Sequence, residues 1–352
     1  MAEVIVTFRN IKDKEFVTPP MQVPDDFTSA QMEQFLNTFL AHDKSYAFFH
    51  NGEQIEKVPA CENEETLQID FIAVTKILSE TAKIEVDSQI TAISIRRHPE
   101  IHMDTIIICT STGETKEYSL SLGMEPVMTF NSFKPIRAVT STEDGIYVLT
   151  TTNKVVDVCK GDIVYECDTP IRTISNSGEY LAIGLITDEI VILKKNEEVK
   201  KVKASGEIGK LIMRSSEGEP MLICAISSGC IEVYKGEQFE MHSYKLATPI
   251  TAAGYDEGVI YAGGLGGMIY ICNMEGVQKE YKSDVDFISR IEGGSVFFGY
   301  SNKNSILLRD RETYMGTHRI DLAAPVADMK ISGKRLFTAE GKSLKIFNIF
   351  DE

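Results

Sequence analysis

The amino-acid sequence predicts an all-β protein, a seven-bladed β-propeller that follows a small N-terminal α/β domain. Three observations carry this prediction. A short apolar strand recurs seven times after residue 80, about every 39 residues. Polar and Gly-rich turns separate the strands within each repeat. Residues 3–75 break the repeat and contain a helical pattern, and a chain of 352 residues is long enough for one large and one small domain.

The N-terminal domain is predicted to span residues 1–76. Its expected strands lie at residues 4–8, 16–23, 46–49 and 67–71, with a helix between the second and the third. Thr28 and Gln31 have capping-box spacing at the start of this helix. The apolar residues of the helix fall on one face, which we expect to pack on the sheet: Met32, Phe35, Leu36, Phe39 and Leu40. The order ββαββ and the length fit a ubiquitin-like β-grasp domain.

The seven repeats are predicted to fill residues 77–352. They begin at the apolar markers Ile90, Ile136, Ile171, Ile208, Ile250, Phe287 and Val326. In five repeats a second and more apolar strand begins nine residues after the marker, a third follows across a turn, and most repeats end with a more polar fourth strand. Four antiparallel strands in about 40 residues are typical of a propeller blade.

The last repeat ends at Phe350 after only three strands. The segment Leu78–Val86 precedes the first marker and reads as a strand that no repeat uses. We therefore expect it to complete the seventh blade, which would leave no open sheet edge in the ring.

The repeats resemble WD-repeat blades in length and strand order. The chain has no Trp, however, and at the position of the Trp-Asp dipeptide only Asp310 remains. This difference weakens the WD label more than it weakens the propeller prediction.

Composition and charge exclude several classes of protein. The chain has 36 Lys and Arg against 52 Asp and Glu, a net charge of −16, which disfavours a broad phosphate-binding face; any rRNA contact is therefore expected to be local. Its first residues have no signal-peptide pattern, no apolar run is long enough to span a membrane, and the seven cysteines form no CxxC pair. We expect a soluble intracellular protein with reduced thiols and no membrane contact.

Sequence motifs for catalysis are missing. The six histidines are scattered without metal-binding spacing, and no nucleophile elbow or P-loop occurs. The run Gly263–Gly267 joins two strands of one repeat, which favours a hairpin over a phosphate loop. The protein is therefore expected to be no enzyme and to have no cofactor of its own.

Two stretches of the N-terminal domain carry a family resemblance. Val4 to Asn37, including Pro24-Asp25-Asp26-Phe27-Thr28, and Tyr46 to Ile55 resemble the Notchless-like (NLE) ubiquitin-like domain, which precedes a WD-repeat propeller. The resemblance implies a factor for biogenesis of the large ribosomal subunit, located in the nucleolus and nucleus, that docks on pre-60S particles as a scaffold. Two types of member stay open: residues 46–55 look more like Notchless itself, whereas seven repeats fit the WD-repeat partner of the Pescadillo complex.

The same resemblance implies a site in the turn before the last strand of the domain. In this family an acidic side chain completes the coordination of a Mg²⁺ ion held by the AAA ATPase midasin, and the matching residue here is Glu64. Asn63 and Glu65 flank it in the predicted partner-binding turn, and Glu65 takes its role if the alignment shifts by one residue. Spacing alone would favour a merely solvated acidic turn. Two other functions stay open, a ubiquitin-like propeller scaffold in protein turnover or signalling and an enzyme with its site in the central channel.

Overall fold

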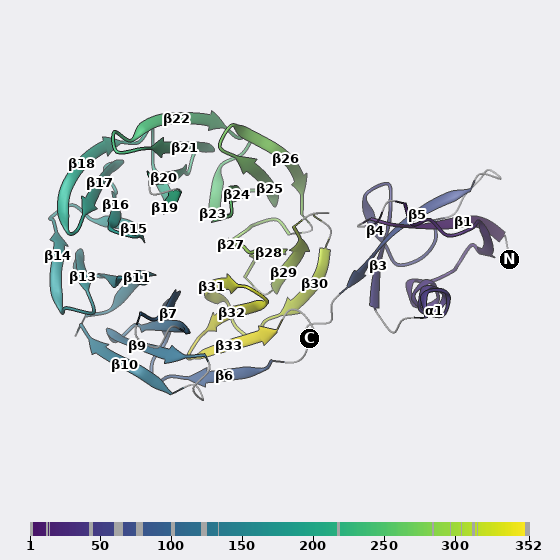
Figure 1. The fold of residues 1–352 in the computed structure, drawn as a ribbon, viewed down its shortest axis with the longest axis horizontal. Helices are drawn as coiled ribbons and strands as arrows, with labels where there is room; N and C mark the ends of the chain where they lie inside the picture. Colours follow the sequence, from purple (N-terminus) through teal and green to yellow (C-terminus); the bar gives the residue numbers. More distant parts are fainter. Residues whose placement is uncertain are drawn as a thin grey trace.

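The protein is an all-β chain with one helix within the described residues (Figure 1). The computed structural model describes residues 3–11, 13, 15–41, 45–59, 66–74, 80–99, 103–120, 125–132, 134–216, 219–283, 285–295, 297–303, 305–311, 314 and 316–348. A small sheet with the helix lies outside a ring of four-stranded sheets, next to strand β30 (Gly316–Asp321).

The N-terminal sheet has five strands in the order β2-β1-β5-β3-β4. Their bounds are β1 Glu3–Asn10, β2 Met21–Pro24, β3 Ser45–His50, β4 Glu53–Ile55 and β5 Leu67–Val74. β1 and β5 are parallel, and the other pairs are antiparallel. The second strand is much shorter than the predicted 16–23, because Pro19 and Pro20 have no N–H for the ladder; Val17 contributes only an isolated bridge to Arg9.

Helix α1 (Ser29–Leu40) covers the sheet and begins with the predicted capping box. Gln31 N donates to Thr28 Oγ1 at 3.4 Å, and Thr28 N donates to Gln31 Oε1 at 2.8 Å. Met32 and Leu36 are fully buried in the domain core, and Phe35 packs against it. Phe39 differs from the prediction because it lies at the margin of the helix face, where it is 48% exposed and stacks on Phe35.

The ring contains seven four-stranded antiparallel sheets within the described residues, the arrangement of a β-propeller (Figure 1). From the inner to the outer strand, the first three are β7 (Ile90–Arg97), β8 (Asp104–Thr110), β9 (Glu114–Ser119), β10 (Pro126–Asn131); β11 (Ile136–Thr142), β12 (Gly145–Thr150), β13 (Lys154–Asp157), β14 (Asp162–Glu166); and β15 (Ile171–Ser177), β16 (Tyr180–Leu185), β17 (Glu189–Lys194), β18 (Glu197–Lys203). The next three are β19 (Ile208–Ser216), β20 (Glu219–Ile226), β21 (Cys230–Lys235), β22 (Glu240–Lys245); β23 (Ile250–Asp256), β24 (Val259–Gly264), β25 (Met268–Asn273), β26 (Gly276–Lys282); and β27 (Arg290–Gly293), β28 (Phe297–Ser301), β29 (Ser305–Asp310), β30. The last is β31 (Val326–Ser332), β32 (Arg335–Glu340), β33 (Ser343–Asn348) and β6 (Ala82–Glu85).

Most of the predicted apolar markers open an innermost strand and share one irregularity. In six sheets the pairing shifts by one residue directly after the marker, as between Ile208 and Lys210. The marker Phe287 is off by one position: it bridges to Leu265 and is 40% exposed, whereas Ile288 is fully buried. The buried position of the repeat therefore belongs to Ile288.

The last sheet is completed by a strand from the N-terminal side of the ring. β6 pairs antiparallel with β33, from Ser343 opposite Glu85 to Ile346 opposite Ala82. Ile84 and Val86 are buried in an apolar cluster that joins this sheet to the first one. Residues 78 and 79 of the predicted strand lie outside the described residues.

Apolar side chains fill the space between neighbouring sheets. One such cluster joins Ile223 and Val233 of one sheet to Ile260 and Tyr270 of the next. Charge is also buried in the ring: Arg96 and Glu117 form a bidentate pair, with both contacts at 2.8 Å and side chains 4% and 0% exposed. In the described part of the chain, no helix is long and apolar enough to cross a membrane.

Candidate functional site

The predicted partner-binding residues Asn63, Glu64 and Glu65 lie outside the described residues. The chain on either side of them is fixed to the domain core. Val58 is fully buried and its N–H donates to Phe27 O at 2.9 Å. After the turn the chain enters β5, which lies between β1 and β3. The described chain thus leaves the core of the N-terminal domain after Val58 and rejoins it in β5, and the role of Glu64 stays a prediction.

The strand before this turn, β4, lies at the edge of the sheet and faces the ring. Asn51 and Gly52 connect it to β3 with φ values of 52° and 84°, the left-handed pair that a tight hairpin requires. Glu53 and Gln54 are exposed on this edge. Gln54 lies close to β30, because a Cβ built on Gly316 would be 3.4 Å from Gln54 Oε1.

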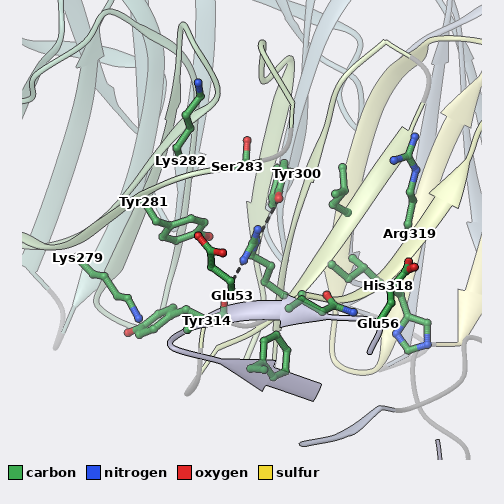
Figure 2. Close-up of a pocket in the computed structure, with 17 residues that line it drawn as sticks. Glu53, Glu56, Lys279, Tyr281, Lys282, Ser283, Tyr300, Tyr314, His318 and Arg319 are labelled. Atoms are coloured by element: carbon green, nitrogen blue, oxygen red, sulfur yellow. Dashed lines mark hydrogen bonds between the residues drawn. The ribbon is translucent and has the colours of Figure 1, made fainter. Parts of the chain in front are cut away.

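A cavity of about 1030 Å³ lies between β4 and the outer strands of two neighbouring sheets (Figure 2). The N-terminal domain contributes two acidic side chains to its wall, Glu53 and Glu56. The ring contributes the basic side chains Lys279, Lys282, Arg309 and Arg319. Opposite charges therefore face each other across the cavity, although exposed pairs of this kind contribute little to stability.

Aromatic rings lie against two of these basic side chains. Arg309 lies 4.6 Å from the ring centre of Tyr281 and 5.7 Å from that of Tyr300, and its Nε donates to Tyr300 Oη at 3.1 Å. Lys279 Nζ lies 4.6 Å from the ring centre of Tyr314. Cation–π contacts of this kind order long side chains that would otherwise be mobile.

Burial changes the protonation of the groups in this cavity. It lowers the pKa of His318 to about 4, so the imidazole is neutral near pH 7. Burial also lowers the pKa of Lys279, and the neighbouring Arg309 lowers it further. The pKa of Tyr281 is raised by burial, against the opposing effect of Arg309. These groups form a charged and aromatic contact surface, with no group of three potential metal ligands in the described residues.

Sequence reasoning missed this surface because its residues are distant in the chain. Glu53 comes from the N-terminal sheet, Lys279 and Tyr281 from β26, and Arg309 from β29. In the sequence, only the Asn51-Gly52 dipeptide indicates the hairpin that brings β4 to the ring.

The lysines on and between β17 and β18 are partly neutralised by acidic neighbours. Lys194 pairs with Glu237 at 3.6 Å, and Lys195 pairs with Glu179 at 2.7 Å. Lys201 pairs with its neighbour on the same strand. Three lysines of the cluster thus have acidic partners, which leaves less positive charge for a phosphate.

Residues 4–57 match the model of the NLE (NUC135) domain, which is found in ribosome-biogenesis factors. The match begins in β1, includes α1 and the β3–β4 hairpin, and ends before the turn with Glu64. No curated protein matches the chain. The N-terminal region is therefore similar to the NLE domain of Notchless-like proteins, and it precedes a β-propeller.

Proposed function

We propose that this protein is a biogenesis factor for the large ribosomal subunit, acting in the nucleolus and nucleus. The ring, a seven-bladed propeller in this proposal, docks on the pre-60S particle, and the ubiquitin-like N-terminal domain projects as a handle. A midasin-type AAA ATPase engages the handle and releases the factor. The observation that carries the proposal is the NLE match at residues 4–57, on a sheet that precedes a propeller.

The arrangement of the two parts supports this division of labour. The ring buries its sheets against one another, while β4 stays exposed and faces the ring across a cavity of about 1030 Å³. An interface with so little packing permits relative motion, which is the ordinary behaviour of loosely joined domains. A domain that moves independently can be bound by one partner while the ring stays on another.

Glu64 is the residue that we propose makes the contact with the ATPase. Mg²⁺ prefers hard oxygen ligands in octahedral geometry, so one carboxylate oxygen can replace a water on a metal ion held by the partner. In this scheme Asn63 and Glu65 frame the contact. In this scheme the partner hydrolyses ATP. This protein is an adaptor that needs no catalytic group and no cofactor of its own.

The test compares Glu64→Ala and Glu64→Asp for binding to the metal-ion-binding domain of midasin. A missing methylene withdraws the carboxylate by more than Mg–O bonds of about 2.0–2.1 Å tolerate, so Asp should fail nearly as completely as Ala. EDTA should abolish wild-type binding. Fold stability should change by no more than about 0.5 kcal/mol, as expected for a surface residue.

Glu62→Ala and Glu65→Ala are the matched controls and should bind almost normally. Ordinary surface electrostatics would instead make the three acidic residues equivalent and let Asp replace Glu64. Co-sedimentation of the full chain with pre-60S particles tests the ring separately. Binding by Glu64→Ala that also resists EDTA would contradict the proposed contact.

A further inference from the structure

A second cavity lies on the axis of the ring and has a volume of about 280 Å³. Each of the seven innermost strands, β7, β11, β15, β19, β23, β27 and β31, contributes residues to its wall. Much of the wall is polar, with hydroxyl groups from Ser94, Thr140 and Ser175. The cavity is therefore suited to a hydrophilic ligand rather than to an apolar one.

The wall of the axial cavity has an excess of positive charge, although the chain has a net charge of −16. Its charged residues are the cations Lys210, Arg214 and Lys330 and the acids Asp256 and Glu292. Glu292 already forms an ion pair with Lys330. Asp256 pairs with Arg311 at 2.9 Å. Arg214 lies 5.6 Å from the ring centre of Tyr255 and is attracted by Asp256. Lys210 is thus a cation of the wall that forms no ion pair with a described residue.

Lys210 makes neither a hydrogen bond nor an ion pair with any described residue. Burial lowers its pKa, and repulsion from Lys330 lowers it further; Arg290 acts in the same direction, against the attraction of Glu292 and Asp328. Asp328 attracts Lys210 without bonding to it: its two oxygens accept from Ile93 N and Met329 N, both at 2.9 Å, and Oδ1 lies 4.0 Å from Arg290 Nε. A buried ammonium without a direct counter-ion destabilises the ring, and a bound anion would reduce that cost.

Asn176 supplies a second donor to the same cavity. Thr140 Oγ1 accepts from Asn176 N at 3.0 Å, and its own hydroxyl donates to Asn176 Oδ1 at 2.6 Å. In this arrangement the Oδ1 end of the side-chain amide faces Thr140. The Nδ2 group of Asn176 is buried without a partner, and the residue is 3% exposed. A buried N–H₂ donor in the cavity wall needs an acceptor.

We propose that the axial cavity is a binding site for one oxyanion group, a carboxylate or a phosphate, held by Lys210 and Asn176. Both groups offer N–H donors, and an ionised oxyanion offers only acceptors, so their chemistries are complementary. The volume admits a small anion or the end of one side chain. A nucleic-acid strand is disfavoured because the strongly acidic chain repels a polyanion.

The test is isothermal titration calorimetry of the full chain, with inorganic phosphate in one arm and glutarate in the other, at constant ionic strength in a buffer free of other oxyanions. We expect one saturable site per chain. Binding in one arm identifies the preferred group, and binding in both supports a general oxyanion site. Absence of binding in both arms would overturn the proposal.

Two variants locate the site. Lys210→Met should weaken binding by about tenfold or more, the loss expected for one charge-assisted hydrogen bond. Asn176→Asp keeps an oxygen for Thr140 but adds a repelling charge, and should weaken binding at least as much. Lys203→Met, which removes an exposed lysine from β18, is the matched control and should bind as the wild type does. Equal affinity of wild type and Lys210→Met, or an equal loss in Lys203→Met, would place the anion elsewhere. The outcome is independent of the function proposed for the N-terminal domain.

Discussion

The ring and the N-terminal sheet solve the problem of sheet edges in different ways. In the ring every innermost strand lies beside two others, and side chains bond across the junctions, as where Met213 N donates to Ser175 Oγ at 2.8 Å. The strand β6 gives the last sheet its fourth member. The N-terminal sheet keeps two edge strands, β2 and β4, and β4 faces the ring across an open cavity. The ring is therefore stabilised as a whole, whereas the small domain is stabilised by its own core.

Removal of β6, the strand that closes the ring, should destabilise the ring most. Deletion of residues 1–86 removes β6 together with the buried side chains of Ile84 and Val86, which should cost about 3–6 kcal/mol at the usual value for burying an aliphatic side chain. Deletion of residues 1–74 keeps β6 and should leave ring stability nearly unchanged. Urea unfolding of both truncations decides the matter, and equal midpoints would refute closure by this strand.

The second test removes one half of the buried ion pair in the first sheet. Glu117→Gln leaves the Arg96 guanidinium buried without a counter-charge and should destabilise the ring by about 3 kcal/mol. The exposed pair of Lys154 and Glu166 provides the control: Glu166→Gln should cost less than about 1 kcal/mol. Similar losses in the two variants would show that burial does not set the strength of these pairs.

The loss of stability in Glu117→Gln should depend on pH. Burial disfavours the charged form of Glu117, but hydrogen bonds from Arg96 and Thr105 outweigh it and lower its pKa. A carboxylate with a lowered pKa stabilises the fold above its unfolded pKa, about 4.3, and loses this effect as the pH falls through the folded value. The gap in unfolding free energy between wild type and Glu117→Gln should therefore be constant near pH 7 and shrink below about pH 4.3. A gap that widens in acid would contradict the assigned sign.

Contacts across the cavity between the two parts should contribute little to the stability of the ring. Glu53 is exposed on β4, so Glu53→Gln should change the unfolding free energy of the ring by less than about 0.5 kcal/mol. Chemical denaturation monitored by tyrosine fluorescence measures this. A loss above about 1 kcal/mol would mean that the N-terminal domain is part of the ring's cooperative unit.

Regular patterns made most of the fold predictable. The apolar markers recur because each innermost strand buries the same position. Thr28 and Gln31 predict the start of the helix because their hydrogen bonds form within one turn. The prediction chose Phe287 as a marker because it is as apolar as its buried neighbour Ile288, and only the packing distinguishes the two. The short strand β4 was missed although Asn51-Gly52 signals its hairpin. Three residues leave too little alternation to detect.

The candidate sites were less predictable than the fold. Lys210 and Asn176 belong to different sheets and line one cavity because the sheets surround a common axis, so no local spacing relates them. The turn with Glu64 was found through a family resemblance rather than through a physical signal in its own residues. A site whose residues are brought together by the fold can be found only in the structure. An element formed by neighbouring residues can be predicted from the sequence.

The position of β6 has a mechanical consequence. β6 is the first strand of the ring after the N-terminal domain, so a force applied to the domain is transmitted first to the ladder between β6 and β33. That ladder is short, with flanking bonds from Thr81 N to Ile346 O at 2.9 Å and from Val86 N to Lys342 O at 3.0 Å. A pull along the strand loads these bonds together in shear, whereas a pull away from the ring ruptures them one after another from Thr81. The direction of traction thus decides whether the ring is carried away whole or opened at its seam.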